Sequence, residues 1–265
     1  MHYFSVGCSF KNNTLHRLPE FLAYHAVIGA SRFYLINGET DPTLGIELLR
    51  PYSGFVKHIH MPGVGLISNT HVHNTLTNSA RGETRWLAYL DVDEFLMPMC
   101  KNSVVEVLED YDDYSALYVN WQIFGSSGLI SRPAWWTERF VHRSHVDFFV
   151  NRHVKCIGNP EKMHAFITPH YAPTTDGRSV NEFYQGVGGS HSEIHTSKIR
   201  LNHYVVGSLD DFKEDIALFG YKDWDFFNIH DRNEVFDDSI WVRFGEKVKE
   251  FHASIERCRP YCKSP

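Results

Sequence analysis

The first half of the chain alternates short apolar segments with amphipathic or polar ones, and this alternation limits the possible folds more than any other feature. Five apolar segments are typical of strands and lie at residues 3–8, 32–37, 55–60, 86–90 and 116–121. Four segments between them are predicted as helices and lie at 18–28, 46–49, 68–81 and 104–109, with Ser103 as the expected cap of the last. Strands and helices in this order predict an α/β fold with a mostly parallel central sheet flanked by helices. Ligands of such sheets bind beyond the carboxyl ends of the strands.

The second half is less regular. Strands are predicted near residues 139–142, 153–157, 163–168 and 199–206, and the Gly- and Ser-rich stretch 174–192 is predicted as a loop. The stretch 208–211 resembles a capping box at the start of a helix that runs to Phe219. A final amphipathic helix carries Ile240, Trp241, Phe244, Val248 and Phe251 on one face. Since no repeat or linker divides the chain, a single domain is expected.

Composition excludes several classes of protein. Hydrophobic residues make up 43% of the 265 residues and charged residues 22%, which excludes disordered, collagen-like and coiled-coil chains. The net charge of −6 leaves no basic excess for binding nucleic acid. No apolar run approaches the roughly 20 residues of a membrane-spanning helix and no signal peptide is visible, so a cytoplasmic location is expected. The five cysteines form no CxxC pair, which argues against a disulfide framework or a zinc ribbon.

An acidic turn follows the most apolar of the predicted strands. Trp86 to Leu90 is a run of the kind found in buried parallel strands, and it ends in Asp91-Val92-Asp93. Residues two apart in an extended segment point the same way, so the two aspartates are expected to project together. Two like charges held that close favour a cation between them, and oxygen ligands select Mg²⁺ or Mn²⁺. The alternative is a solvated turn, because Asp is common in turns.

The chain also has 17 histidines, which by itself suggests a metal protein. Most of them are interpreted as surface and helix residues, whose shared titration would make the net charge sensitive to pH below neutrality.

Several motifs together resemble one enzyme family. The stretch 86–96 resembles the W-x-x-φ-φ-D-x-D-E-F signature of glycosyltransferase family 92 and its bacterial and viral family-2-like relatives. Further matches to the family, in the family's order, are Lys11-Asn12, the stretch 18–25 with Gly29, 120–128 (N-W-Q-I-F-G-S-S-G), 138–140 (E-R-F), 155–157 with Pro160, His164, and 202–204 (N-H-Y). The ordered set spans about residues 3 to 220 and is far more specific than any one motif.

This resemblance implies a GT-A (Rossmann-like) fold in a single domain. Residues 1–122 are expected to form the nucleotide-sugar-binding half, residues 123–235 a smaller, irregular half that completes the metal site and binds the acceptor, and residues 236–265 a C-terminal helix and tail.

The resemblance also implies a metal site. Asp93 is assigned to a Mn²⁺ or Mg²⁺ ion, Asp91 to the metal or to the donor's ribose, and His203 is the candidate third ligand. The alternative for a lone histidine is a hydrogen-bonded structural residue. Glu94 is interpreted either as orienting these groups or as capping the turn.

The remaining candidate residues are assigned to the donor, the acceptor and the proton transfer. Those assigned to the donor are Lys11, Asn12, Asn37, Lys155, Gly125, Ser126 and Ser127. The alternative is ordinary turn chemistry, and for Lys155 it is a lysine at a strand edge whose charged end reaches solvent. Those assigned to the acceptor are Trp135, Trp136 and His164, whereas Trp121 is interpreted as a core residue. An inverting transfer needs a general base, for which Glu138 is the first choice and Asp147 the second. An ion pair with Arg139 is the alternative for Glu138.

Two regions depart from the family pattern. Asn13 replaces the Glu of K-N-E, Phe21 replaces a Trp, and the residues after N-H-Y are Gly207-Ser208, followed by the acidic Lys213-Glu214-Asp215 in place of a basic segment. The cation that binds the donor diphosphate, and with it the sugar nucleotide, is therefore left open.

The sequence thus predicts a metal-dependent glycosyltransferase that moves a hexose from a nucleoside-diphosphate sugar to a glycan or lipid-linked glycan acceptor in polysaccharide biosynthesis, with inversion. The basic tail at 257–263 is a candidate for peripheral contact with the inner membrane. Two alternatives are a catalytically decayed carbohydrate- or nucleotide-binding module and a metal-dependent phosphoesterase. The phosphoesterase would use the pairs His58–His60 or His71–His73, of which only the first shares a strand face.

Overall fold

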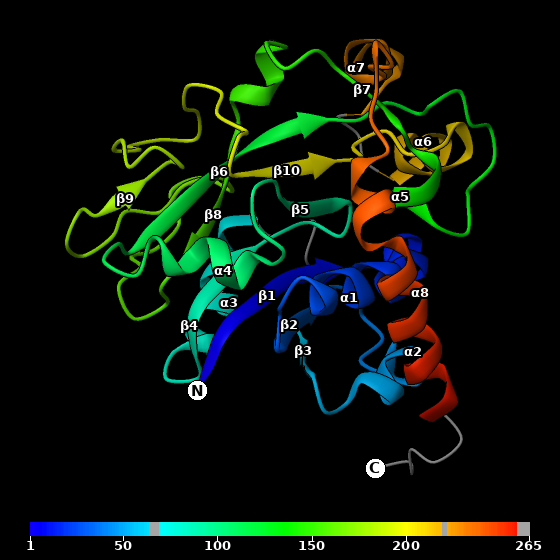
Figure 1. Cartoon of the computed structure of the whole chain (residues 1–265). Coiled ribbons are helices and arrows are strands. Elements are labelled where there is room, and N and C mark those ends of the chain that lie inside the picture. The colour runs from blue at the N-terminus through cyan, green and yellow to red at the C-terminus, as the bar shows by residue number, and fades with distance from the viewer. Residues whose placement is uncertain (64–68, 219–221, 259–265) are drawn as a thin grey trace.

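Nine strands build one mixed sheet in the computed structural model, which describes residues 1–63, 69–218 and 222–258 (Figure 1). Eight of them follow the order β3-β2-β1-β4-β8-β6-β10-β5, and β9 pairs with the beginning of β6. The strands are β1 (His2–Phe10), β2 (Arg32–Asn37), β3 (Val56–His60), β4 (Thr84–Tyr89), β5 (Glu94–Pro98), β6 (Ala116–Ile123), β8 (Val154–Gly158), β9 (Ser179–Val180) and β10 (Ile199–His203).

Most of these strands share one direction. The pairs β3–β2, β2–β1 and β1–β4 are parallel. Strand β8 runs antiparallel to both β4 and β6, so β6 has the direction of β4, and β10 is parallel to β6. Strand β5 runs antiparallel to β10. The predicted α/β fold with a mostly parallel central sheet is therefore confirmed, and the carboxyl ends of β1, β2, β4, β6 and β10 lie along one edge.

Helices cover both faces of the sheet. They are α1 (Leu18–Val27), α2 (Ile46–Leu49), α3 (Asn69–Ala80), α4 (Val104–Glu109), α5 (Trp136–Arg139), α6 (Leu209–Leu218), α7 (Trp224–His230) and α8 (Ser239–Cys258), with short 3₁₀ segments η1 (Asn12–Arg17), η2 (Arg50–Tyr52) and η3 (Phe149–Arg152). A separate two-stranded sheet joins β7 (His142–Arg143) to β11 (Val235–Phe236). Helix α8 lies along α1, as Figure 1 shows.

The position of strand β4 in the sheet explains why residues 86–90 are all apolar and do not alternate between apolar and polar side chains. Trp86, Ala88 and Leu90 point into the larger core, which also contains buried residues of α1, α4 and α8. Leu87 and Tyr89 point into a second core beneath α3. Because a central parallel strand is covered on both faces, both sets of side chains must be apolar.

Local signals at the helix starts are confirmed. Ser103 Oγ accepts the Glu106 N–H (3.1 Å) at the start of α4. Ser208 Oγ accepts the Asp211 N–H (3.2 Å) while Asp211 Oδ2 accepts the Ser208 N–H (3.1 Å), which is the reciprocal capping box predicted for α6. The predicted helix ends at Ser68 and Phe219 lie outside the described residues.

Two predicted strands are wrong. Arg139 ends α5, so only His142 and Arg143 of the region 139–143 are extended in a ladder. The stretch 163–168 makes only single bridges, at Met163 and Thr168, within its own loop. Sequence analysis also missed β5, because its partner β10 lies about a hundred residues further along the chain and short-range patterns carry no sign of that pairing.

Candidate active site

A cavity of about 780 Å³ lies at the carboxyl edge of the sheet. Its lining comes from the ends of several strands. It includes Phe10 at the end of β1, Lys11 directly after it, the turn 91–93 after β4, Ile123 of β6 and His203 of β10. This is the place at which an open α/β sheet binds its ligands.

The acidic turn is held by a buried glutamate. Glu94 Oε2 accepts the Asp91 N–H at 2.8 Å, and its side chain has no exposed surface. Val92 packs in the larger core, and Asp91, Val92 and Asp93 all contribute to the lining of the cavity. Burial raises the pKa of Glu94 to about 8. Glu94 thus caps the turn, one of its two interpretations.

Lys155 of β8 neutralises one side of the turn. Its Nζ lies 2.7 Å from Asp91 Oδ2 and 3.3 Å from Glu94 Oε2, and the side chain is buried. Burial by itself favours the neutral amine, but the two carboxylates raise the pKa of Lys155 above its usual value. Burial likewise opposes ionisation of Asp91, yet Lys155 lowers the pKa of that carboxyl. At neutral pH this is an ion pair at the floor of the cavity.

Asp93 faces a different set of partners. Its Oδ1 lies 3.7 Å from His203 Nε2, and its Oδ2 lies 3.6 Å from a guanidinium nitrogen of Arg17. Burial raises the pKa of Asp93 and holds the pKa of His203 well below its ordinary value, so that the imidazole is neutral at pH 7. A carboxylate and a neutral imidazole that face each other are a donor set suited to Mn²⁺.

The three residues predicted to bind metal do not converge equally. Within residues 1–63, 69–218 and 222–258, no group of three or more His, Cys, Asp or Glu side chains is arranged to hold a metal ion. Asp93 and His203 face each other, whereas Asp91 is paired with Lys155. The metal role of all three stays a prediction.

An aromatic wall lines the cavity beside these groups. The Trp121 ring stacks on His153 with centroids 4.8 Å apart, and lies 4.4 Å from the His203 ring and 5.1 Å from the His170 ring. The Nδ1–H groups of His153 and His170 each donate to a backbone carbonyl at 3.0 Å, which leaves Nε2 as the acceptor of each neutral ring. His153 Nε2 lies 3.0 Å from His191 Nε2. Trp121 packs against two of the hydrophobic clusters, as its interpretation as a core residue predicts, and it also lines the cavity.

The residues predicted to bind the donor are dispersed. Lys11 lines the cavity, and Asn12 lines a second hollow described below. Asn37 is buried, where its side chain donates to the Asp41 carbonyl (2.8 Å) and accepts the Glu39 N–H (3.0 Å). These contacts agree with the alternative interpretation of Asn37, in which its side chain stabilises a turn and does not bind the donor.

The F-G-S-S-G segment anchors a distant loop. The Ser126 N–H donates to Asp231 Oδ1 (2.6 Å) and the Ser127 N–H to Asn233 Oδ1 (2.8 Å). A Cβ at Gly125 would lie 2.5 Å from the Arg232 carbonyl oxygen, which explains the glycine. The motif thus joins the end of β6 to the segment after α7, a contact that its position after a strand did not reveal.

The residues predicted for the acceptor and the base lie elsewhere. Trp136 is buried, and Trp135 packs on Trp241 and His252 of α8. Glu138 is half-buried with its carboxylate 3.3 Å from Lys249, while Asp147 and His164 are exposed. Among the described residues, the lining of the 780 Å³ cavity includes none of these five. Their roles remain predictions.

Sequence analysis missed three charged residues of the site. Arg17, Asp215 and Lys222 line the cavity, and Lys222 Nζ lies 2.7 Å from Asp215 Oδ2. Asn13 donates to Asp215 Oδ1 at 3.3 Å, so two positions that depart from the family pattern contact each other. The departures themselves were the only signal in the sequence that could have linked them.

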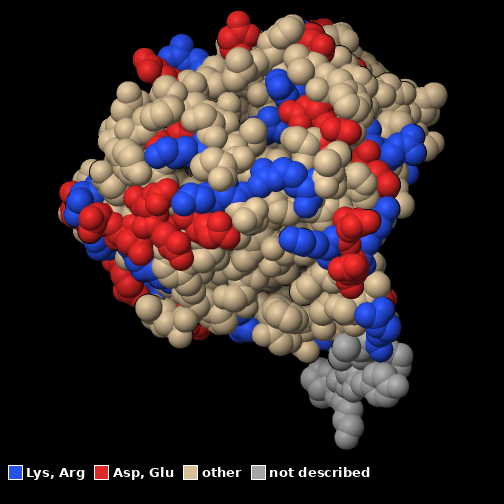
Figure 2. Space-filling model, viewed as in Figure 1, with Lys and Arg blue, Asp and Glu red and all other residues tan. Residues whose placement is uncertain are grey.

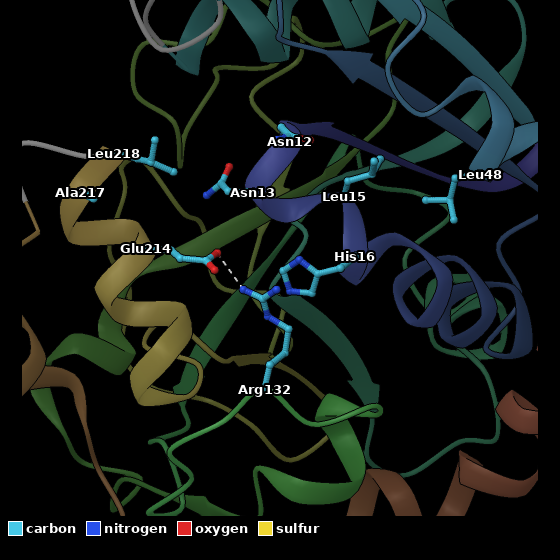
Figure 3. A pocket seen from close by; sticks show the side chains of 9 residues that line it. All are labelled: Asn12, Asn13, Leu15, His16, Leu48, Arg132, Glu214, Ala217 and Leu218. Carbon is cyan, nitrogen blue, oxygen red and sulfur yellow. Dashed lines mark hydrogen bonds and ion pairs between the residues drawn. The ribbon is translucent and has the colours of Figure 1, made fainter.

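A second hollow, of about 650 Å³, lies on the other side of η1. Its lining includes His16 and Arg132, and Figure 3 shows Arg132 reaching toward Glu214 of α6 with the His16 ring beside it. Arg132 also pairs with Asp211 at 2.7 Å, and Asp211 lies 3.8 Å from Arg17. Asp211 therefore connects the two hollows.

Other surface features bear on the remaining expectations. Figure 2 shows an acidic patch on the left of the face viewed, which adjoins a row of Lys and Arg side chains across the centre. His73 is buried against Tyr89 and Phe166, while His71 is exposed on the same helix. Among the described helices, none combines the length and apolarity needed to cross a membrane.

Comparison with known proteins identifies the family. The chain matches the sequence model of glycosyltransferase family 92 over residues 2–232. A glycosyltransferase family 92 protein of Ricinus communis is 25% identical over 225 residues, which cover 80% of this chain and 36% of that protein. One of Arabidopsis thaliana is 24% identical over 221 residues, 78% of this chain and 36% of that protein. The chain thus spans about a third of the length of these curated relatives.

Solved structures give more distant matches. HddC from Yersinia pseudotuberculosis aligns with a TM-score of 0.41 and 10% identity over 81% of this chain and 97% of that chain. Residues 1–349 of S. aureus TarS align with a TM-score of 0.38 and 13% identity over 60% of this chain and 47% of that chain. Because the family match extends from the first strand to beyond α7, the chain belongs to glycosyltransferase family 92.

Proposed function

We propose that this chain is a metal-dependent glycosyltransferase that moves a hexose from a nucleoside-diphosphate sugar to a hydroxyl of a glycan acceptor. One observation carries the proposal: in a member of this family, the Asp91–Asp93 turn opens into a 780 Å³ cavity at the carboxyl edge of the sheet. The volume lies within the range of small-molecule sites.

The charges around the cavity suit an anionic donor. Lys11, Arg17, Lys155 and Lys222 all contribute to the lining. Transfer of the sugar builds negative charge on the departing diphosphate, and fixed cations in a partly dry cavity stabilise that charge more strongly than water does.

Asp93 and His203 are the residues proposed to hold a divalent cation. The carboxylate supplies a hard oxygen and the neutral imidazole a nitrogen, and their facing atoms are 3.7 Å apart. Such an ion, when bound, acts as a Lewis acid toward the leaving phosphate. Lys155 keeps Asp91 ionised and fixes the turn, so that Asp93 is presented to the cavity in one orientation.

The acceptor is proposed to enter along Trp121, whose flat ring can carry a sugar face. For an inverting transfer, Glu138 remains the proposed general base, with Asp147 as its alternative. Glu138→Gln should then abolish transfer but leave donor binding intact, and transfer at the wild-type rate would rule it out. A lipid-linked acceptor and membrane contact through the tail are further proposals, and residues 259–265 of that tail lie outside the described residues.

The direct test is a thermal-shift screen of nucleoside-diphosphate sugars with and without Mn²⁺. A donor present at 100 times its Kd should add about 2.7 kcal/mol to the free energy of unfolding, and only when Mn²⁺ is present. Hydrolysis of the selected donor then separates an enzyme from a decayed binding module, which would bind without turnover. Asp93→Asn should remove the Mn²⁺ dependence. If no sugar nucleotide stabilises the chain under either condition, the proposal fails.

A further inference from the structure

The cation that binds the donor diphosphate was left open by the sequence, and the position of Arg17 addresses it. Arg17 ends η1, and its side chain lines the cavity although only 7% of it is exposed. A long charged side chain at this depth is normally held by several hydrogen bonds.

The Arg17 guanidinium has ion pairs without hydrogen bonds. Its nitrogens lie 3.6 Å from Asp93 Oδ2 and 3.8 Å from Asp211 Oδ1, beyond the hydrogen-bond range of about 2.7–3.2 Å. Within the described part of the chain, its buried Nε has no hydrogen-bond partner. The two carboxylates therefore hold the charge in place but do not saturate its donors.

The surroundings fix the plane of the guanidinium. Its central carbon lies 4.3 Å from the centroid of the Trp136 ring. The backbone of Trp136 is in turn held by Glu20, whose carboxylate accepts the Trp136 backbone N–H at 2.6 Å. Asp211 is anchored by Arg132, whose Nε lies 2.7 Å from the same Oδ1, and by the Ser208 hydroxyl, which donates to Oδ2 at 2.6 Å. Arg17 is thus oriented from two directions before any ligand enters.

The other buried cations of the cavity are engaged more closely. Lys155 Nζ and Lys222 Nζ each lie 2.7 Å from a carboxylate oxygen. An ammonium is also a point charge, whereas a guanidinium presents a planar fork of donors that matches two phosphate oxygens.

We propose that Arg17 binds phosphate oxygens of the donor's diphosphate next to Asp93, with Trp136 and Asp211 as its positioning residues. This inference rests on the proposed function. It assigns a donor-binding role to a residue outside the acidic turn, and it accounts for a buried guanidinium whose donors the protein leaves unsaturated.

The test measures binding rather than turnover. Inorganic pyrophosphate, UDP and GDP are titrated calorimetrically in the presence of Mg²⁺ into the wild-type chain and into Arg17→Gln, Arg17→Lys and Arg85→Gln. Arg85→Gln is the matched control, because the Arg85 guanidinium also lies 4.3 Å from a tryptophan ring centroid, that of Trp86, and pairs with Asp112, but Arg85 lines neither hollow. Manganese binding without nucleotide is followed by electron paramagnetic resonance, and unfolding temperatures are recorded for all four chains.

Arg17→Gln should weaken pyrophosphate and nucleoside-diphosphate binding at least tenfold, since hydrogen bonds between charged groups are lost. Arg17→Lys should weaken diphosphate binding by a smaller factor. This variant tests the inference if Arg17→Gln does not fold. Arg85→Gln should change the diphosphate affinity less than twofold. Arg17→Gln should not weaken Mn²⁺ binding, because it removes a positive charge beside Asp93, whereas a merely structural role would weaken both.

The outcomes separate the inference from the proposed function. Wild-type diphosphate affinity in both Arg17 variants, or an equal loss in Arg85→Gln, overturns the role of Arg17 and leaves the glycosyltransferase proposal standing. A wild-type chain that binds neither pyrophosphate nor any nucleoside diphosphate overturns both.

Discussion

His25 should make the protein less stable as the pH falls from 7 to 5. The residue is fully buried in α1, where its Nδ1–H donates to the Phe21 carbonyl at 2.8 Å and its Nε2 faces the Leu96 N–H at 3.5 Å. Phe21 and Phe95 enclose the ring. A second proton on this ring would bury a charge against Leu96 N–H, and burial accordingly lowers the pKa of His25 to about 3.

The sign and size of the effect follow from the two pKa values. In the unfolded chain a histidine titrates near its ordinary pKa of about 6.5. Between pH 6.5 and 3 the unfolded state therefore holds a proton that the folded state does not, so stability decreases as the pH falls through this window. At about 1.36 kcal/mol per pH unit, His25 alone should cost about 2 kcal/mol between pH 7 and pH 5.

Urea unfolding at pH 7 and pH 5 measures this contribution. His25→Gln lowers stability at pH 7 because it disturbs the core, but its loss between the two pH values should be smaller than the wild-type loss by about 2 kcal/mol. His71→Gln, on the exposed face of α3, is the control and should behave like the wild type. The reasoning is refuted if His25→Gln and the wild type lose the same free energy between pH 7 and pH 5.

Three further substitutions test the packing around the site by chemical unfolding. Lys155→Met removes the cation that lies 2.7 Å from Asp91 Oδ2 and 3.3 Å from Glu94 Oε2, and should cost about 1–3 kcal/mol because charge-assisted hydrogen bonds are lost while Asp91 is half exposed; full stability in this variant would contradict the ion pair. Glu20→Gln sets an amide NH₂ against the backbone N–H of Trp136 or Thr137 and should cost about 1–3 kcal/mol. An unfolding curve identical to that of the wild type would exclude these hydrogen bonds. Ser103→Ala should cost about 1 kcal/mol and Ser103→Thr less, while equal losses would argue against the cap of α4.

Patterns over a few residues predicted those strands and helices that are stabilised mainly by interactions between residues close in sequence. The predicted bounds of β2 and α4 agree with the structure, because strand alternation, helix period and the Ser103 cap all act within a few residues. The acidic turn was also located correctly, since an apolar strand buried on both faces ends where the chain becomes polar.

Long-range contacts account for the failures. Strand β5 exists through its pairing with β10, and the F-G-S-S-G segment acquires its contacts from residues 231–233. Neither partner leaves a trace in the local sequence. Arg17 was missed for the same reason, because Asp93 and Asp211 flank it only after three distant segments have folded together.

The histidines show which properties follow from the sequence and which depend on the tertiary structure. Composition alone suggested that the 17 histidines titrate together below neutrality, but burial lowers the pKa of His25 and His73 to about 3 and that of His170 to about 4. The sequence by itself determined the α/β pattern, the position of the acidic turn and the family. Only the tertiary structure decided which charges face each other and which groups titrate, because Coulomb and desolvation energies depend on distance and burial rather than on order along the chain.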